Sequence, residues 1–195
     1  MSSDEFILLL ESYHPEKRAL SNQLKAFLGS ALHELSYRKK YQLLNENQVP
    51  SYAWYLTKGT ARVHYYDQYS QQEVTSWFWF KGELVISLNS FFRQHPSGEN
   101  IQLLEDSTLL RISFADMQIM NRQYPEYRQA EKLLFEDYYS RFNEHSRNMY
   151  CQPTRVRYEQ LEKTHKELLN IANQKDIASF LKMHPKSLSH LRSGK

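Results

Sequence analysis

The residues best suited to chemistry lie near the C-terminus, where donors and hydroxyls gather on one face of a short predicted helix. His184-Pro185 predicts the start of that helix, because proline in a first turn gives up no intrahelical hydrogen bond. Leu188 and Leu191, three residues apart, would hold the helix on a core. Groups of this kind bind phosphate oxygens and base edges. Our candidate DNA-binding residues are Lys175, Lys186, Ser187, Ser189, His190, Arg192 and Lys195.

A second short helix is predicted just before it. Ile177, Ala178 and Leu181 form an apolar stripe at helical spacing, and Met183 is an apolar residue in the turn that follows. Asp176 lies near the predicted helix start, where a carboxylate can accept hydrogen bonds from free backbone amides. Two short helices joined by a tight turn predict a helix-turn-helix, whose second helix enters the DNA major groove. The alternative is a small amphipathic hairpin that only closes a domain.

The distribution of charge favours the first interpretation. The 195 residues carry 25 Lys and Arg against 22 Asp and Glu, a net charge of +3. Residues 1–140 carry 14 basic against 17 acidic groups, whereas residues 141–195 carry 11 against 5. A basic segment gains affinity for a polyanion by releasing counterions, so we expect double-stranded DNA as a partner. The alternative is that the basic segment serves only solubility.

Several kinds of site are disfavoured by composition. The single cysteine, Cys151, excludes a disulfide within the chain, a cysteine-ligated cluster and a zinc knuckle. Beside a proline-containing break, it is expected to be inert rather than a redox or haem sensor. The eight histidines show no metal-ligand spacing, and we find neither a Ser/His/Asp arrangement nor a glycine loop that could cradle phosphate. We therefore expect no enzyme, no metal and no cofactor.

Hydropathy places the chain among core-forming proteins. Hydrophobic residues make up 41% of it, which is enough to build a core. No segment approaches the roughly 20 apolar residues that a membrane span needs. The acidic start over residues 1–5 differs from a secretion leader, which begins with positive charge and continues with an apolar run. The prediction is a cytoplasmic protein without a membrane partner.

The elements that must position the candidate residues are predicted from hydrophobic periodicity. Residues 5–35 have helical spacing, interrupted at Pro15. Lys58-Gly59 predicts a turn, and a helix is expected from Phe114 onward. Short strand-like segments are predicted at 37–44, 52–56, 60–66, 71–79 and 107–113. Several short strands joined by turns indicate an antiparallel barrel or roll, so the predicted fold class is α+β.

A long helix is predicted over residues 125–150, opened by Pro125. Its apolar seam mixes spacings of four and three, as helix pairing requires, and includes Leu134, Tyr138, Phe142 and His145. We expect this seam to join two copies of the chain; the alternative is a single core helix. Gln152-Pro153-Thr154 predicts a break. Residues 155–170 then predict a further helix whose inward side chains are Val156, Leu161, Leu168 and Leu169. The predicted domains are therefore 1–124, 125–150 and 151–195.

The order of these parts resembles the cyclic-AMP-receptor/Fnr family of transcription regulators. The matching segments are Tyr55-Leu56-Thr57-Lys58-Gly59-Thr60-Ala61-Arg62, Phe80-Lys81-Gly82-Glu83-Leu84, Leu103-Leu104-Glu105-Asp106-Ser107, Ile177-Ala178-Ser179-Phe180-Leu181 and Ser187-Leu188-Ser189. The resemblance covers nearly the whole chain and depends on order and spacing rather than on one motif. It implies a cyclic-nucleotide-binding-like β-roll of the double-stranded β-helix type, a dimerisation helix, and a winged-helix-like helix-turn-helix domain in a homodimeric, bacterial DNA-binding regulator.

The resemblance also implies a ligand cassette, which is degenerate in this chain. Its residues would be Gly82, Glu83, Leu84, Ser97, Glu99 and Asn100. Family members that bind cyclic nucleotides have Arg-Ser/Thr-Ala where this chain has Ser97-Gly98-Glu99-Asn100. A phosphate beside Glu99, with no arginine to neutralise it, would be costly in a partly buried pocket, although Arg93 or His95 could substitute. The family contacts the ribose hydroxyl through the residue matching Glu83, which we expect here to be a surface carboxylate. Activation by cyclic AMP is therefore not expected.

The predicted recognition helix departs from the family as well. Pro185, Lys186 and His190 stand where members often have Arg, Glu and Arg, so the usual reading of G·C pairs is not expected. Lys182 replaces a glycine in the turn, which implies strain or a different turn shape. The sequence given stops three residues after Arg192, so a truncated wing is expected. Groove contacts would come from the helix start and from Lys186, Ser187, Ser189 and His190, and phosphate contacts from Arg192 and Lys195.

Three functions are consistent with these residues. The favoured one is a homodimeric transcription regulator. If it responds to a small-molecule effector, that effector is unknown. The second is a module that binds a small, cyclic-nucleotide-like ligand and regulates a protein partner. The third is an assembly protein that uses the helical seam. Trp54, Trp77 and Trp79 alternate as strand residues do and are expected in the core of the roll, although they could line an effector pocket.

Overall fold

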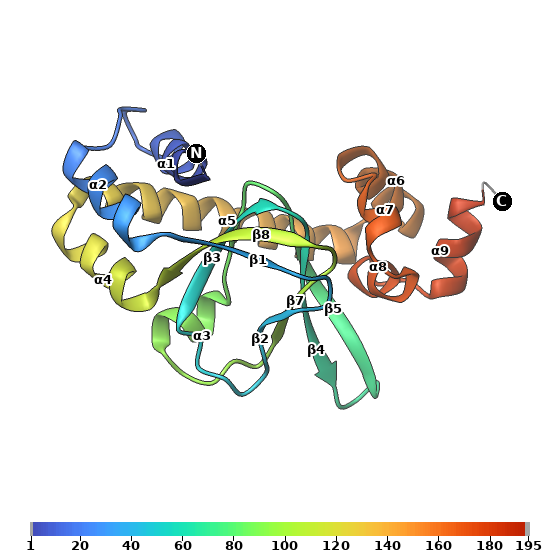
Figure 1. The fold of residues 1–195 in the computed structure, drawn as a ribbon. Coiled ribbons are helices and arrows are strands. Elements are labelled where there is room, and N and C mark those ends of the chain that lie inside the picture. Colours follow the sequence, from blue (N-terminus) through green and yellow to red (C-terminus); the bar gives the residue numbers. More distant parts are fainter. Residues whose placement is uncertain (1, 194–195) are drawn as a thin grey trace.

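The fold is centred on a β-roll, seen in a computed structural model that describes residues 2–193 (Figure 1). Within these residues the strands form two four-stranded antiparallel sheets. One sheet has the order β1 (His33–Tyr37), β8 (Ser107–Ser113), β3 (Tyr52–Lys58) and β6 (Leu84–Val85). The other has the order β2 (Gln42–Leu44), β7 (Asn100–Leu103), β4 (Ala61–Asp67) and β5 (Gln72–Trp79).

The turn from β3 to β4 depends on a glycine. Gly59 has a φ of 108°, in the left-handed region that residues other than glycine rarely adopt. A Cβ atom there would lie 2.0 Å from the Ser107 hydroxyl oxygen, which is an impossible approach. The chain therefore crosses from one sheet to the other at the Lys58-Gly59 turn that the sequence predicts.

Helices flank the roll and continue beyond it. Their bounds are α1 (Ser2–Ser12), α2 (Asn22–Ala31), α3 (Leu88–Arg93), α4 (Phe114–Gln123) and α5 (Pro125–Cys151). Figure 1 shows α5 running along the roll and reaching the C-terminal helices α6 (Thr154–Thr164), α7 (Leu168–Ile171), α8 (Gln174–Phe180) and α9 (Pro185–Arg192). Local signals fix several ends: Ser21 and Ser113 cap α2 and α4 by accepting from the amides of Leu24 and Asp116.

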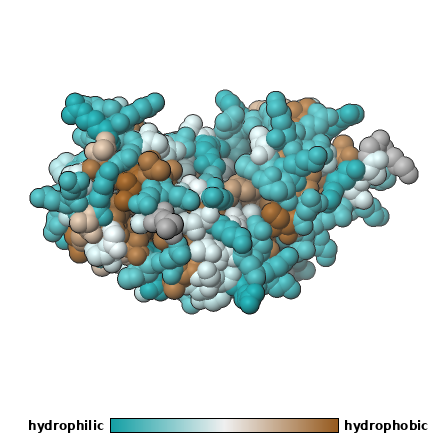
Figure 2. All heavy atoms as spheres, turned by 45° about the horizontal axis from the view of Figure 1, so that its top comes forward, coloured by the Kyte–Doolittle hydropathy of each residue, from teal (hydrophilic) through white to brown (hydrophobic). Residues whose placement is uncertain are grey.

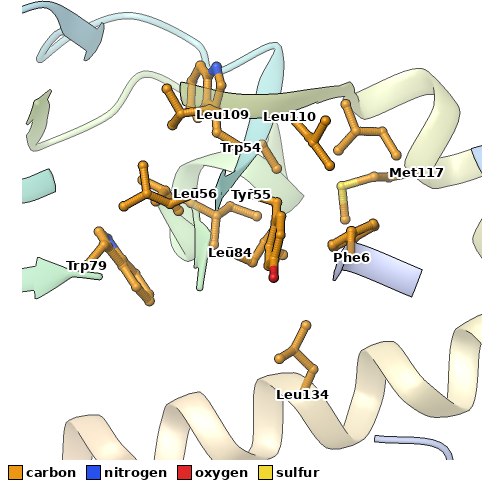
Figure 3. Packing of buried hydrophobic residues seen from close by; sticks show 14 of the residues in the cluster. Phe6, Trp54, Tyr55, Leu56, Trp79, Leu84, Leu109, Leu110, Met117 and Leu134 are labelled. Atoms are coloured by element: carbon orange, nitrogen blue, oxygen red, sulfur yellow. The ribbon is translucent and has the colours of Figure 1, made fainter. Parts of the chain in front are cut away.

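Two hydrophobic cores hold the chain together. The larger lies inside the roll and against α1, α4 and α5; Figure 3 shows Phe6, Tyr55, Leu56 and Leu84 of this core converging, with Leu134 directed toward them from α5. The smaller belongs mainly to the C-terminal helices and includes Leu161, Leu168, Leu169, Ile177 and Leu188. Phe78 and Leu104 of the roll complete the smaller core. The C-terminal helices are thus packed onto the roll and do not merely follow it.

The predicted fold class is confirmed: an α+β chain with an antiparallel β-roll, a long helix and a terminal helix-turn-helix. Four details differ. Leu35 lies in strand β1 rather than in the N-terminal helical region, and the strand predicted over 37–44 is interrupted by a turn between β1 and β2. The helix predicted over 155–170 is broken between Thr164 and Leu168, and Val156 is 37% exposed because it lies on the outer side of α6.

The surface is mainly hydrophilic on the face shown in Figure 2, with small, separate hydrophobic areas. Among residues 2–193, no helix combines the length and the apolar character needed to cross a bilayer. That part of the chain likewise contains no cluster of three or more His, Cys, Asp or Glu side chains placed to hold a metal ion. Cys151 is a free, exposed thiol at the end of α5.

Candidate nucleic-acid interface

Helix α9 presents most of the predicted DNA-binding residues at one end of the molecule (Figure 1). Pro185 stands in its first turn, and Nδ1 of His184 caps it by accepting from the Lys186 amide at 3.1 Å. Leu188 is fully buried and Leu191 packs against the same core, so the opposite face is outward. The side chains left exposed there are Lys186, Ser187, Ser189, His190 and Arg192. Lys175 is exposed on α8, and Lys195 lies outside the described residues.

The turn between α8 and α9 has the geometry of a helix-turn-helix. Lys182 has a φ of 47°, so a lysine occupies the left-handed position for which the resemblance implies glycine. The Met183 amide donates to the Ala178 carbonyl at 2.9 Å and closes the end of α8. Nε2 of Gln174 donates to the Pro185 carbonyl at 2.8 Å and joins the two helices. The helix-turn-helix prediction is confirmed as a structural motif.

Helix α8 is anchored on strands β4 and β5 by a buried ion pair. The Asp176 carboxylate lies 2.7 Å from Nη1 of Arg62, and the two residues are 8% and 7% exposed. Arg62 also pairs with Glu73 at 2.8 Å and donates to Gln102 at 3.0 and 3.1 Å. Burial raises the pKa of Asp176, and the positive charge of Arg62 opposes that rise. As expected, Asp176 also has a backbone hydrogen bond at its helix start, from the N-cap residue Asn173.

An aromatic cluster reinforces this anchoring. Phe180 at the end of α8 lies edge-on to Phe78 with ring centroids 5.0 Å apart. Its other face stacks on His145 of α5 at 4.3 Å, with 15° between the ring planes. Burial, together with the charges of Lys182 and Arg157, lowers the pKa of His145 to about 4. The imidazole is therefore neutral near pH 7 and serves as a stacking partner between α5 and α8.

The four residues predicted to form a dimer seam face the roll of their own chain. Leu134 and Tyr138 are 1% and 2% exposed. The Tyr138 hydroxyl accepts from the Leu84 amide at 2.7 Å, and the Phe142 ring lies 4.1 Å from that of Trp77. His145 stacks on Phe180, so all four side chains pack against their own chain, and their role in joining two copies stays a prediction. Their spacing marks an inward face of α5, which Trp77 and Trp79 of strand β5 cover at Tyr138 and Phe142.

In the first half of the predicted cassette, Glu83 ties the roll to α5. Gly82 supplies the turn with a φ of 87°, and Leu84 is buried in the core. The Glu83 carboxylate accepts from the Phe80 amide at 2.8 Å and forms an ion pair with Arg141 of α5. Its side chain is only 14% exposed, so the expectation of a surface carboxylate is wrong. Both of its oxygens are engaged within the chain.

In the second half, the carboxylate of Glu99 points into the protein. Its Oε1 accepts from the Ser87 hydroxyl at 2.7 Å, and burial raises the pKa of Glu99. Ser97 and Asn100 shape the turn: the Ser97 hydroxyl donates to the Glu99 carbonyl at 2.8 Å, and Oδ1 of Asn100 accepts from the Glu46 amide at 2.9 Å. In residues 2–193, no basic side chain forms an ion pair with Glu99. This position therefore holds a carboxylate and lacks a cation for a phosphate.

Comparison with solved structures identifies the architecture. A putative transcriptional regulator of the crp/fnr family from Eubacterium rectale superposes with a TM-score of 0.68 at 13% identity, over 94% of this chain and 87% of that one. FixK2 from Bradyrhizobium japonicum has a TM-score of 0.67 at 12% identity, with coverages of 84% and 83%. A CooA mutant from Carboxydothermus hydrogenoformans has a TM-score of 0.63 at 19% identity, with coverages of 85% and 76%. The chain has the fold of these proteins. No protein-family model and no curated protein sequence matches it.

The residues that sequence reasoning missed are the cations that join the parts. Arg62 and Arg141 each pair with a carboxylate far away along the chain, and Arg157 of α6 is buried at the junction of α5, α6 and α8. The one available signal was the position of Arg62 between the apolar residues Ala61 and Val63 of a predicted strand. Sequence alone does not say which acid such an arginine would meet.

Proposed function

We propose that this chain is a sequence-specific DNA-binding transcription regulator of the Crp/Fnr type, acting as a homodimer and without catalytic activity. The observation that carries the proposal is the outward face of α9, which is polar and basic while Leu188 anchors the other face. The shared fold with solved regulators supports it. Lys186 and His190 offer donors for the N7 and O6 acceptors of guanine, and the hydroxyls of Ser187 and Ser189 are suited to either role.

The chemistry of α9 also restricts the operator. No acidic residue occurs between Pro185 and Arg192, so the helix offers no carboxylate to accept from the amino group of cytosine. Arg192 lies in the last turn, away from the end that enters the groove first, and is suited to phosphate. We therefore propose half-sites in which guanines are read on one strand by Lys186 and His190.

Cyclic AMP is not the proposed signal. A cyclic nucleotide held in the family's manner would need Glu83 for its ribose and a cation for its phosphate. Glu83 is engaged by Arg141 and the Phe80 amide, and Glu99 places a carboxylate at the phosphate end. The same contacts speak against the alternative of a cyclic-nucleotide-binding module that regulates a protein partner. Titration calorimetry with cyclic AMP and cyclic GMP should show no saturable heat; binding with a Kd below about 1 mM would contradict this.

The proposed dimer uses the outward face of α5. Tyr139 and Tyr150 are 68% and 78% exposed, and Asn143 lies exposed between them. These residues follow one another at steps of four and seven, which keeps them on one side of a helix. Two copies of α5 paired through this face would bring two α9 helices into one molecule. A palindromic operator, with half-sites about one duplex turn apart, follows from the two-fold symmetry of such a pair.

The function is tested by selecting the sequences that the full chain binds from random duplex DNA. The selection is carried out at a stated salt concentration. We expect enrichment of a palindrome, and failure to enrich any sequence would refute sequence-specific binding. On the selected duplex, Lys186→Ala and His190→Ala should each lower affinity by about 1–3 kcal/mol, or roughly 5- to 150-fold. Affinity for unrelated duplex should fall much less.

The matched control is Lys58→Ala, which removes the same charge from an exposed position at the end of β3. It should leave the affinity for the selected duplex nearly unchanged. Equal losses for Lys186→Ala on selected and unrelated duplex would remove Lys186 from base reading. Losses no larger than that of Lys58→Ala would remove α9 from the interface altogether.

A further inference from the structure

A cavity of about 450 Å³ lies where the end of α5 meets α6 and α8. His145 and Met149 contribute from α5, Arg157 and Leu161 from α6, and Phe180 from α8. Its volume falls within the range of about 300–1,000 Å³ that is typical of small-molecule sites. None of its lining residues belongs to the cassette or to the outward face of α9.

Arg157 makes this cavity unusual, because it is a buried cation without an anion. The residue is 8% exposed. Its Nη1 donates to the carbonyl oxygen and the sulfur of Met149 at 3.3 and 3.5 Å, and its Nη2 donates to the Thr154 hydroxyl at 3.2 Å. All of these acceptors are neutral. The buried Nε–H of Arg157 has no hydrogen-bond partner, and no carboxylate within residues 2–193 forms an ion pair with it.

The comparison with Arg62 shows what is missing. Arg62 is equally buried, but it meets two carboxylates, those of Asp176 and Glu73. Removing a guanidinium from water is costly, and a paired anion normally offsets that cost. A planar guanidinium with a free donor is also well suited to an oxyanion, which it binds through two parallel hydrogen bonds. The environment of Arg157 is therefore that of an anion site.

The rest of the lining indicates what else the ligand must offer. Lys163 adds a second cation, and Glu144 on α5 is the one acidic residue among the described residues that line the cavity. Apolar and aromatic walls come from Leu161, Met149 and Phe180. We propose that this cavity binds a small molecule with one oxyanion group on an aromatic or apolar body, and that Arg157 binds the oxyanion.

A ligand in this cavity would contact three elements at once. Because α5 belongs to the roll's core and α8 to the helix-turn-helix, occupancy favours one arrangement of the reader helices against the long helix. This regulatory consequence rests on the proposed function, whereas the binding of the ligand does not. The effector site thus lies at the junction of the domains and not inside the roll.

Phenyl phosphate is the probe, and benzyl alcohol is its neutral counterpart. Titration of the full chain should give one site per chain with a Kd below about 1 mM for phenyl phosphate, and no saturable binding of the alcohol. In a ¹H–¹⁵N spectrum of the arginine side chains, one Nε–H resonance should shift with the same saturation. That resonance should be missing from the spectrum of Arg157→Met.

Variants distinguish binding at this cavity from nonspecific attraction of the anion to basic residues. Arg157→Met should weaken phenyl phosphate binding at least tenfold, whereas Arg155→Met should not, because Arg155 is exposed on the same helix and paired with Glu159. If Arg157→Met does not fold, Thr164→Trp replaces it, since this change fills the cavity from its lining and leaves the guanidinium intact. Equal binding by the wild type and Thr164→Trp, a shift of another arginine, or no saturable binding with a Kd below about 1 mM would overturn the proposal.

The two proposals fail separately. If DNA selection enriches nothing but phenyl phosphate binds through Arg157, the function is wrong and the site stands. If DNA is enriched and Arg157 does not bind the probe, the function stands and the site is wrong. If both DNA selection and phenyl phosphate binding succeed, saturating phenyl phosphate should change the affinity of the wild type for the selected duplex at least threefold. It should not change the affinity of Thr164→Trp. An unchanged affinity would overturn the regulatory consequence.

Discussion

Removing either partner of the Arg62–Asp176 pair should destabilise the chain, and by different amounts. In Arg62→Met, Asp176 stays buried without a cation, which typically costs about 3–5 kcal/mol. In Asp176→Asn, Arg62 keeps Glu73 at 2.8 Å and its hydrogen bonds to Gln102, so only one charge-assisted contact is lost, worth about 1.5–3 kcal/mol. Replacing both partners, in Arg62→Met/Asp176→Asn, should cost less than Arg62→Met alone, because the one carboxylate left without Arg62, that of Glu73, is 48% exposed.

The assay is urea denaturation at pH 7 and 25 °C, followed by tryptophan fluorescence, which gives the free energy of unfolding of each variant. The ring centroids of Trp77 and Phe180 are 6.2 Å apart, so the fluorescence of Trp77 reports on the contact between α8 and the roll. Arg155→Met is the matched control. It breaks the exposed Arg155–Glu159 pair within one helix, which should cost no more than about 0.5 kcal/mol.

Two outcomes would refute this reasoning. If Arg62→Met loses no more stability than Arg155→Met, the pair does not anchor the helix-turn-helix on the roll. If the double variant loses the sum of the two single losses, the partners are not coupled. A coupling free energy of about 2–3 kcal/mol, with Arg62→Met the worse single change, is the expected result.

Three further predictions concern acid, burial and pairing. The folded state holds the pKa of His145 at about 4, below the ordinary 6.5, so the free energy of unfolding should fall by about 3 kcal/mol as the pH drops from 6.5 to 4. His145→Phe keeps the stack on Phe180 and should remove this loss, as measured by denaturant titrations at each pH. Burial raises the pKa of Glu99, so its ionisation destabilises the fold above pH 4.5; Glu99→Gln, which still accepts from Ser87, should raise the free energy of unfolding at pH 7 and leave it unchanged near pH 4. Tyr139→Glu should convert the proposed dimer to a monomer in sedimentation equilibrium, and an unchanged mass would exclude this face.

The elements predicted best are those whose signals are local. Strands β3, β4, β5 and β8 begin and end within about two residues of the predicted segments. Their residue pattern lies within each segment, and the Lys58-Gly59 turn separates β3 from β4. Helix α5 starts at the predicted Pro125 and ends at Cys151, one residue beyond the prediction. The short strands β6 and β7 and the helix α3 have too few residues to show a period, and they were not predicted.

The candidate site was predicted only as far as local patterns extend. Leu188 and Leu191 fix which face of α9 is buried, so its outward residues follow from the sequence. The periodicity of α5 identifies a buried face with equal clarity, but it does not say what covers that face. The cover is Trp77 and Trp79 of β5 and their neighbours, more than 50 residues earlier in the chain. Ion pairs between distant residues are likewise invisible to any local pattern.

Three arginines, each at a junction between parts of the chain, differ in a way that bears on regulation. Arg141 joins α5 to the cassette through Glu83, and Arg62 joins α8 to the roll through Asp176, so both of these junctions are closed by charges of the chain itself. Arg157 stands at the third junction, between α5, α6 and α8, and meets only neutral acceptors among the described residues. An external anion adds least where an internal carboxylate already sits and most where a buried cation lacks one. A small anionic signal would therefore act at Arg157 rather than in the cassette.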